Sequence, residues 1–205
     1  CEMDEIMALA NSLGIKVIED CAQAHGASYK GREVGSMGHA AAFSFCQDKI
    51  ITTGGEGGLL ATNDADLWER AWAYKDHGKS YRAVHDQDHP PGFRWLHESF
   101  GTNWRMTEIQ AAIGRIQLNK LPEWSARRRS HAALLQTELE AVPGLRTPMA
   151  PLHSRHGQYR YYAYLDLARL RSGWTRDRIV SEVSAHGAPC FSGSCSEIYR
   201  EKAFS

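Results

Sequence analysis

The sequence predicts an α/β fold built on a parallel sheet, and features of its N-terminal part carry this prediction. Residues 2–13 place apolar side chains at helical spacing, and Gly14 ends the pattern. Residues 15–18 form a short apolar run followed by two acidic residues, which is typical of a buried strand. A helix, a tight turn and a strand in this order form the αβ unit of a parallel sheet.

Two more strands and a helix are expected next along the chain. Residues 40–45 and 58–61 are short apolar runs, and each predicts a strand. Residues 62–64 ("TND") predict a helix N-cap, because short polar side chains accept hydrogen bonds from the first backbone N–H groups of a helix. The helix that they open is expected to run to Gly78.

The middle of the chain is expected to contain a long loop and two helices. Residues 81–101 are rich in Pro, His and Asp and predict an irregular loop, of a length that is usually functional or mobile. Residues 107–110 ("TEIQ") predict a capping box that opens an amphipathic helix. Pro122 is expected to break this helix, and residues 124–141 are expected to form another, with the arginines of residues 126–130 ("ARRRS") facing solvent.

The C-terminal part predicts a second domain. Residues 147–156 have the character of a linker, residues 159–167 alternate as a half-buried strand does, and residues 174–186 predict a helix. We therefore expect residues 1–150 to be part of a large domain and residues 151–205 to be the start of a smaller one.

Composition and charge exclude several classes of protein. The 205 residues are 42% hydrophobic and 23% charged, as in ordinary globular proteins rather than collagens or disordered chains. The net charge is zero with histidine neutral, so no attraction to nucleic acid or to a membrane surface is expected. No apolar run approaches the ~20 residues that span a bilayer, and the acidic N-terminal stretch does not resemble a signal peptide. These features predict a cytoplasmic protein, and the start at Cys1 predicts a piece of a longer chain.

Cysteine and histidine patterns predict neither disulfides nor a metal site. The number of cysteines is odd, their spacing is scattered and no C-x-x-C motif occurs, which favours reduced thiols in a cytosolic protein. None of the ten histidines lies in a paired-ligand pattern such as H-E-x-x-H, so no metal is expected. The five cysteines are Cys1, Cys21, Cys46, Cys190 and Cys195.

The segment "FSFCQDKIITTGGEGG" (residues 43–58) contains the first candidate for chemistry, Lys49. A Walker A motif places its lysine after the glycines and at a helix start, whereas Lys49 precedes them, so nucleoside triphosphate binding is not expected. A glycine-rich turn with a surface lysine is the plain alternative. Asp20 favours a third interpretation, because it follows a predicted strand at the edge where α/β proteins bind ligands. An acid and a lysine in this arrangement suit pyridoxal phosphate, whose aldehyde bonds the lysine as a Schiff base and whose pyridine nitrogen pairs with the acid.

Two longer motifs extend this interpretation. They are "VIEDCAQAHGASYKGREVGSMGHAAAFSFCQDKIITTGGEGGLLATND" (residues 17–64) and "GTNWRMTEIQAAIGRIQLNKL" (residues 101–121), and both resemble the DegT/DnrJ/EryC1/StrS family of pyridoxal-phosphate-dependent nucleotide-sugar aminotransferases. The resemblance implies a large domain of the aspartate-aminotransferase type (fold type I), with a mostly parallel sheet, and the start of a smaller α+β C-terminal domain. It also implies a whole protein nearly twice this length, with part of the cofactor site N-terminal to this segment.

The resemblance implies a role for each matching polar residue. Asp20 would pair with the pyridine nitrogen, and Gln23 would lie near the phenolic oxygen of the ring. Ser44 would donate its hydroxyl to the phosphate, and Lys49 would form the Schiff base and then move protons. Each of the first three has a structural alternative: Asp20 as a helix N-cap, Gln23 as a buried turn residue and Ser44 as a core hydroxyl bonded to the backbone.

Other residues of the two motifs have less specific assignments. Asn103 and Arg105 resemble residues that reach the cofactor site of a partner subunit, which implies a homodimer with a shared active site. Their alternative is to cap the helix after Thr107 or to form a surface ion pair. His25 is interpreted as a structural histidine with satisfied hydrogen bonds, and Glu56 fits a structural or a functional role equally.

The resemblance implies a ping-pong aminotransferase. Glutamate would convert pyridoxal phosphate to pyridoxamine phosphate, which would then aminate a keto sugar of a nucleoside diphosphate sugar, for surface polysaccharide, lipopolysaccharide or antibiotic sugar synthesis. One alternative is a sugar dehydrase of the same family that uses pyridoxamine phosphate, but such relatives carry histidine at the position of Lys49. The other is a cofactor-binding or regulatory protein without turnover. The loop within residues 81–101 is expected near the dimer interface or the substrate entrance.

Overall fold

The computed structural model describes residues 1–193 and 197–204, so Cys195 lies outside the described residues. The chain divides into two compact units, which are described separately. Unit 1 comprises residues 1–129 and 150–159, and unit 2 comprises residues 130–149 and 160–205. The four described cysteines are all free thiols. No helix in the described ranges combines the length and the apolar character that crossing a bilayer demands.

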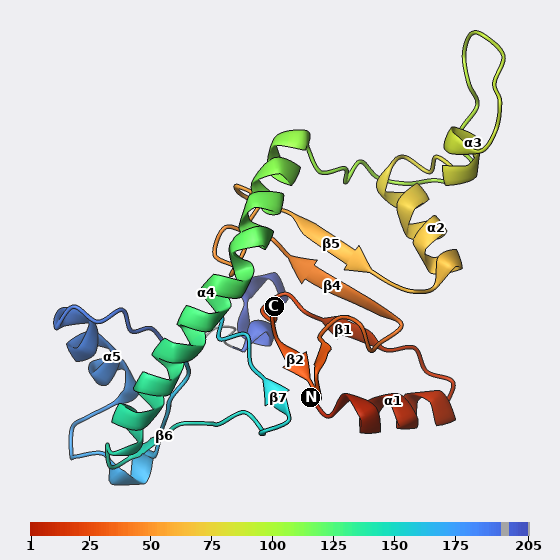
Figure 1. Ribbon diagram of the computed structural model, residues 1–205. Helices are drawn as coiled ribbons and strands as arrows, with labels where there is room; N and C mark the ends of the chain where they lie inside the picture. Colours follow the sequence, from red (N-terminus) through yellow and green to blue (C-terminus); the bar gives the residue numbers. More distant parts are fainter. Residues whose placement is uncertain (194–196, 205) are drawn as a thin grey trace. The chain divides into compact units, whose positions relative to one another are not determined.

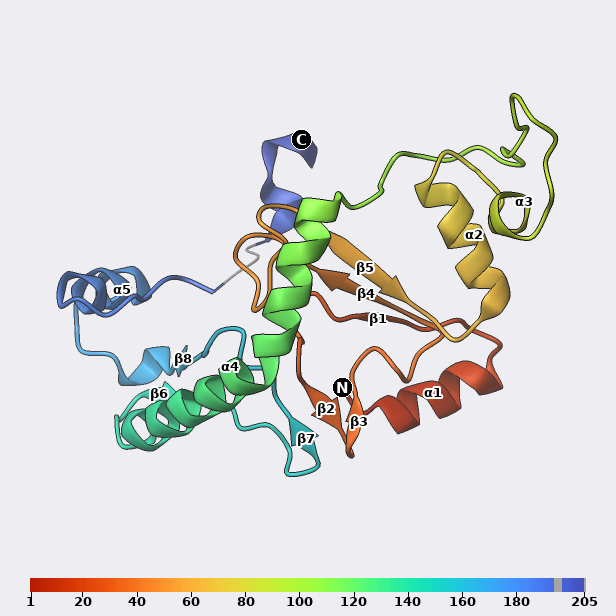
Figure 2. The same ribbon diagram turned by 45° about the horizontal axis from the view of Figure 1, so that its top comes forward.

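The main sheet of unit 1 has three strands in the order β1-β4-β5 (Figures 1 and 2). The strands β1 and β4 pair in parallel, as the sequence predicts, with Asp20 opposite Ala42. The strand β5 is antiparallel to β4, with Gly58 opposite Ser44, so the Lys49 segment connects two neighbouring strands. The bounds are β1 (Ile18–Asp20), β4 (Ala40–Ser44) and β5 (Gly58–Ala61).

The prediction for the first strand was wrong in its position, because β1 begins at Ile18 rather than at residue 15. The preceding helix, α1 (Met3–Ser12), matches its prediction closely. Its C-terminal turn extends into the next residues, since Gly14 has a φ of 65° and the Ile15 N–H donates to the Ala10 carbonyl at 2.8 Å. Ile15 therefore closes the helix and is not available to pair in the sheet.

The helix α2 (Ala65–Lys75) begins where the polar run "TND" predicts it. Asp64 is its N-cap, with its carboxylate accepting from the Leu67 N–H at 3.0 Å. The helix ends at Lys75 rather than at Gly78, because His77 adopts a left-handed φ of 59°. The expectation of an irregular loop over residues 81–101 also needs correction at its start. Ser80 caps a short helix, α3 (Tyr81–His85), by accepting from the Ala83 N–H.

A second small sheet in unit 1 corrects the expectation of a linker over residues 147–156. The strand β7 (Ser154–Arg155) pairs with β2 (Ser28–Tyr29), which also pairs with β3 (Arg32–Glu33). Arg155 forms an ion pair with Glu33 at 2.9 Å, and His153 contacts Glu2 at the same distance. These partners lie far away in the sequence, so local patterns did not indicate the pairing.

The prediction that Pro122 ends a helix was wrong, because α4 (Glu108–Glu140) continues through it. Proline removes one backbone N–H and crowds the preceding turn, and packing offsets this cost. On either side of it, Leu121 and Trp124 pack against a buried cluster formed by Ile50, Ile51 and Tyr159. Tertiary contacts of unit 1 therefore hold the helix together where the local sequence disfavours it.

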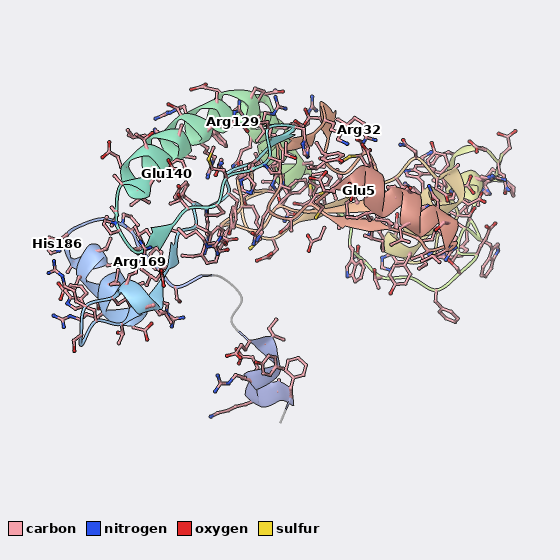
Figure 3. All side chains as sticks on the ribbon, turned by 90° about the horizontal axis from the view of Figure 1, so that it is seen from below. Glu5, Arg32, Arg129, Glu140, Arg169 and His186 are labelled. Carbon is pink, nitrogen blue, oxygen red and sulfur yellow. The ribbon has the colours of Figure 1, made fainter. Side chains whose placement is uncertain are left out.

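Unit 2 contains the second part of α4, a two-stranded antiparallel sheet and one further α-helix (Figure 3). Of the strand predicted over residues 159–167, only β8 (Tyr164–Leu165) forms, paired with β6 (Leu145–Arg146). The helix predicted over residues 174–186 is confirmed as α5 (Arg176–Ala185), capped by Thr175. The described residues of this unit also form three short 3-10 helices: η1 (Leu167–Arg169), η2 (Ile198–Arg200) and η3 (Lys202–Phe204). The division into domains at residue 150 remains a prediction for the whole protein.

Candidate active site

Lys49 lies in the connection between β4 and β5. Its N–H donates to the Cys46 carbonyl at 3.0 Å, which closes a tight turn immediately after β4. The next two residues, Ile50 and Ile51, are 3% and 5% exposed, so they anchor the connection in the core of unit 1. The side chain of Lys49 is only 15% exposed. This burial disfavours the alternative of a surface lysine on a flexible turn.

Two side chains surround the amine of Lys49. Its Nζ lies 3.7 Å from Asp48 Oδ1 and 5.2 Å from the centroid of the Tyr159 ring. The Tyr159 hydroxyl donates to Asp48 Oδ2 at 2.5 Å. This hydrogen bond is the main cause that holds the pKa of Asp48 below its usual value, with the Lys49 charge adding to the effect. Asp48 therefore carries its negative charge at neutral pH.

Asp20 and Ser44 lie at the same edge of the main sheet. Asp20 ends β1 opposite Ala42, and Ser44 ends the neighbouring parallel strand two residues after Ala42. Asp20 is exposed, and its Oδ1 accepts from the Ala22 N–H at 3.0 Å. This is the bond of an Asx turn rather than of a helix N-cap, since no helix begins in residues 21–27.

Ser44 and Gln23 differ in burial. Ser44 is half-buried, and its Oγ accepts from the Cys46 N–H at 3.3 Å. A hydroxyl that accepts one hydrogen bond can still donate its own proton, so this bond leaves the donor function of Ser44 intact. Gln23 is exposed, which contradicts its alternative interpretation as a buried turn residue.

His25 corrects the expectation of a structural histidine with satisfied hydrogen bonds. It is 3% exposed, and its ring packs against Phe43 and Phe45, at centroid distances of 5.7 and 5.9 Å. Neither ring nitrogen has a hydrogen-bond partner among the described residues. Burial is the main cause that lowers the pKa of His25. The backbone of Ser44 raises this pKa in part, and the charge of Lys49 lowers it further. The imidazole is therefore neutral at neutral pH.

Glycines and Glu56 shape the end of the connection. A Cβ on Gly57 would lie 2.2 Å from the Thr53 hydroxyl, so the backbone passes closer to Thr53 than any other residue would permit. The Glu56 carboxylate accepts from the Cys46 thiol at 3.4 Å, and the Glu56 carbonyl accepts from Gln110 Nε2 at 2.8 Å. These bonds support the structural role of Glu56.

Asn103 and Arg105 make a separate group of contacts. Arg105 Nε donates to Asn103 Oδ1 at 3.1 Å and lies 3.4 Å from Asp76 Oδ1. Asp76 is 8% exposed and also pairs with Lys79 at 3.4 Å. The ion pair of Arg105 agrees with the structural alternative for this residue. Its role toward a partner subunit remains a prediction.

Sequence patterns did not identify Asp48 or Tyr159 as neighbours of Lys49. Asp48 is adjacent to Lys49 in the sequence, which was the one available signal. Tyr159 reaches the connection only through the fold, since residues 150–159 return to unit 1. Among the described residues, no three histidine, cysteine, aspartate or glutamate side chains gather as a metal-ligand set.

The chain is therefore an α/β protein with a largely buried lysine side chain in the connection between two neighbouring strands of its main sheet. An aminotransferase from Psychrobacter cryohalolentis has a structure that superposes on it with a TM-score of 0.94 and 57% sequence identity, covering 100% of this chain and 54% of that chain. The predicted fold class is therefore confirmed. Residues 1–191 match the DegT/DnrJ/EryC1/StrS aminotransferase family, and the chain belongs to this family, as its motifs predict.

Curated relatives support the same assignment. GDP-perosamine synthase of Escherichia coli O157:H7 is 41% identical over 142 residues, which cover 69% of this chain and 36% of that protein. The dTDP-3-amino-3,4,6-trideoxy-alpha-D-glucose transaminase of Streptomyces venezuelae is 37% identical over 148 residues, which cover 72% of this chain and 36% of that protein. The chain thus spans about half the length, or less, of the proteins that it matches.

Proposed function

We propose that the whole protein is an aminotransferase that uses pyridoxal phosphate, and its pyridoxamine form, to move an amino group from glutamate to a keto sugar of a nucleoside diphosphate sugar. The observation that carries this proposal is the placement of Lys49. Its largely buried side chain belongs to the connection that follows β4, at the end of the strands where Asp20 and Ser44 also lie. Membership of the aminotransferase family gives this arrangement its chemical meaning.

The side chains present fit the cofactor by their chemistry. Lys49 offers a primary amine to an aldehyde, Asp20 offers an exposed carboxylate to a pyridinium nitrogen, and Ser44 offers a hydroxyl donor to a phosphate. Gln23 offers an amide near the same edge. When bound, the cofactor would supply an electron sink for the carbon atom that loses or gains the amino group.

Each residue then has a defined task. The Asp20 carboxylate would hold a proton on the ring nitrogen of a bound cofactor, because an anion stabilises the charged form of its neighbour. Ser44 Oγ accepts from the Cys46 N–H and could still donate its proton to a phosphate oxygen. Lys49 Nζ would hold the cofactor through its aldehyde and would serve as the group that carries the proton at the reacting carbon.

The substrate class rests on the relatives. One of them is named as a synthase of a GDP sugar and another as a transaminase of a dTDP sugar. We therefore assign a nucleotide-sugar ketone as the acceptor, in the cytoplasm, for polysaccharide or antibiotic sugar synthesis. A homodimer with a shared site, to which Asn103 and Arg105 contribute, belongs to the same proposal.

Absorbance of the whole protein tests the proposal. A lysine bonded to the cofactor aldehyde absorbs near about 410–430 nm, and glutamate is expected to remove this band. The band is expected to vanish in Lys49→Ala. A band that persists with glutamate rejects glutamate as the donor, and a band that survives Lys49→Ala unchanged removes Lys49 from its role. If the protein instead binds pyridoxamine phosphate and dehydrates the sugar, it is a sugar dehydrase of the same family. If it binds the cofactor without turnover, it is a cofactor-binding or regulatory protein.

A further inference from the structure

Asp48, Lys49 and Tyr159 form a contact triangle that the aminotransferase chemistry does not explain by itself. Its three sides are the Tyr159–Asp48 hydrogen bond at 2.5 Å, the Asp48–Lys49 approach at 3.7 Å and the position of Lys49 Nζ 5.2 Å from the Tyr159 ring centroid. Tyr159, which is distant in the sequence, thus contacts both the Asp48 carboxylate and the Lys49 amine.

The fold holds Tyr159 firmly in this position. Its side chain is 9% exposed and packs with Ile50 and Ile51, the two residues after Lys49. Arg128 on α4 donates through Nη1 to the backbone carbonyls of Gln158 and Tyr159, both at 3.2 Å. The guanidinium therefore fixes the main chain of Tyr159, while the buried isoleucines fix its ring. Arg128 belongs to the run that was expected to face solvent, and this contact corrects that expectation.

The Lys49 side chain is only 15% exposed, so its amine needs partners that replace water. The Asp48 carboxylate attracts it, and the Tyr159 ring presents a negative face at a distance typical of cation–π contacts. The Tyr159 hydroxyl keeps Asp48 oriented, since a charge-assisted hydrogen bond to Oδ2 leaves Oδ1 on the side of Lys49. The three groups thus define one preferred position for Nζ.

We propose that Asp48 and Tyr159 are positioning residues for Lys49, which hold its free amine beside the site whenever the amine is not bonded to the cofactor. This inference rests on the proposed function. In that function the amine would be free of the cofactor for part of each cycle and would then serve as the proton carrier. A fixed resting position lowers the entropy cost of bringing the amine back to the reacting atoms.

Chemical labelling of the cofactor-free whole protein tests the contact without any catalytic readout. Formaldehyde and cyanoborohydride methylate neutral amines, and peptide mass spectrometry reports the rate at each lysine. In Asp48→Asn we expect Lys49 labelling at neutral pH to rise about two- to fivefold, because the amine loses the partner that holds it beside Tyr159, and the change is modest because that carboxylate is exposed. Asp48→Glu is expected to retain part of the protection, and Tyr159→Leu to lose it as Asp48→Asn does.

Controls lie in the same chain. Lys75 Nζ lies 4.7 Å from the Trp72 ring centroid, so it serves as an internal reference whose labelling stays unchanged in every variant. Glu123→Gln neutralises an exposed carboxylate on α4 and is expected to leave Lys49 unaffected. Tyr159→Phe keeps the buried ring and removes only the hydroxyl, so it remains informative if Tyr159→Leu does not fold. For it we expect a smaller rise in labelling.

A kinetic measurement links the contact to function. In the loaded enzyme, Asp48→Asn is expected to lower kcat of the glutamate half-reaction about tenfold with little change in KM, and Asp48→Glu is expected to restore part of it. Unchanged labelling in both Asp48→Asn and Tyr159→Leu, beside an intact absorbance band and half-reaction, would overturn the positioning role alone. Shifted labelling in a protein that never forms the lysine–cofactor band would instead overturn the proposed function, and with it the catalytic meaning of the contact.

Discussion

His25 and Phe43 lie with their ring centroids 5.7 Å apart, and the imidazole is buried without a hydrogen-bond partner among the described residues. Such a histidine resists protonation, because charging it would place a cation in apolar surroundings beside the Lys49 ammonium. Its pKa is lowered in the folded state, so the unfolded chain binds a proton more readily than the folded chain does.

This relationship predicts a pH dependence of stability. Because the folded pKa of His25 is lowered, its neutral form contributes stability above about pH 6.5, the unfolded value, and that contribution is lost as the pH falls below it. We compare melting temperatures of the parent and of His25→Phe. The parent's melting temperature minus that of the variant is expected to fall between about pH 8 and pH 5. A difference that stays constant over this range would contradict the prediction.

Substitution of Glu19, which has no role in the proposed chemistry, is expected to lower the free energy of unfolding strongly. Glu19 is 8% exposed and accepts three backbone N–H groups, from Gly35 and Met37 at 2.8 Å and from Gly38 at 2.6 Å. Glu19→Ala removes both acceptor oxygens and so breaks all three bonds, and it is expected to cost about 2–4 kcal/mol, because three part-buried N–H groups lose charge-assisted bonds to a buried carboxylate. Urea unfolding of the whole protein measures this cost.

A matched carboxylate provides the control for Glu19. Glu33 forms an exposed ion pair with Arg155 at 2.9 Å, and Glu33→Ala is expected to cost no more than about 1 kcal/mol. Equal losses of unfolding free energy in the two variants would show that the buried Glu19 carboxylate contributes no more than an exposed one. The comparison therefore separates the effect of burial from that of charge.

A side chain at position 57 is expected to clash with Thr53, and removal of the Thr53 hydroxyl is expected to relieve the clash. A Cβ at this position would lie 2.2 Å from Thr53 Oγ1, and Thr53 is 2% exposed, so the clash has little room to relax. Gly57→Ala is expected to destabilise the protein by about 1–3 kcal/mol. In the Thr53→Ala background the same change is expected to cost less, because the opposing hydroxyl is absent. Equal costs in both backgrounds would reject the clash as the cause.

Sequence patterns predicted the local features of the fold well. Asp64 caps α2 as the run "TND" indicates, and the capping box is confirmed, since Thr107 Oγ1 accepts from the Gln110 N–H at 3.3 Å and Gln110 Oε1 accepts from the Thr107 N–H at 3.1 Å. These contacts join residues three apart, so their geometry follows from the helix itself. The parallel β1–β4 pair is also confirmed, because a helix, a turn and a strand restrict the topology strongly.

Features that depend on distant residues were beyond these patterns. The pairing of β7 with β2 and the contact of Tyr159 with Asp48 each join segments more than one hundred residues apart. Pro122 was expected to break a helix on local grounds, whereas packing of Leu121 and Trp124 onto the Ile50 cluster overrides this preference. In the candidate site, sequence motifs nominated Lys49 and Asp20, but the surroundings of the amine required the fold.

Asp20 gives the sharpest prediction for activity. If its carboxylate holds a proton on the cofactor ring, Asp20→Asn removes the anion and keeps the size and the acceptor for the Ala22 N–H. We expect the rate of the glutamate half-reaction to fall by about 10²–10⁴-fold, the range of a lost proton-holding group, while the whole protein keeps its melting temperature within a few degrees. Stopped-flow absorbance near the lysine–cofactor band measures the rate.

A second carboxylate near the amine separates this effect from a general loss of charge. Asp48→Asn also removes one anion from the surroundings of Lys49, but its expected loss in rate is only about tenfold, because it positions the amine and does not hold the ring proton. Glutamate binding should change little in either variant. If Asp20→Asn lowers the rate no more than Asp48→Asn does, the ring nitrogen has no need of the Asp20 carboxylate, and its assignment as the cofactor's anionic partner fails.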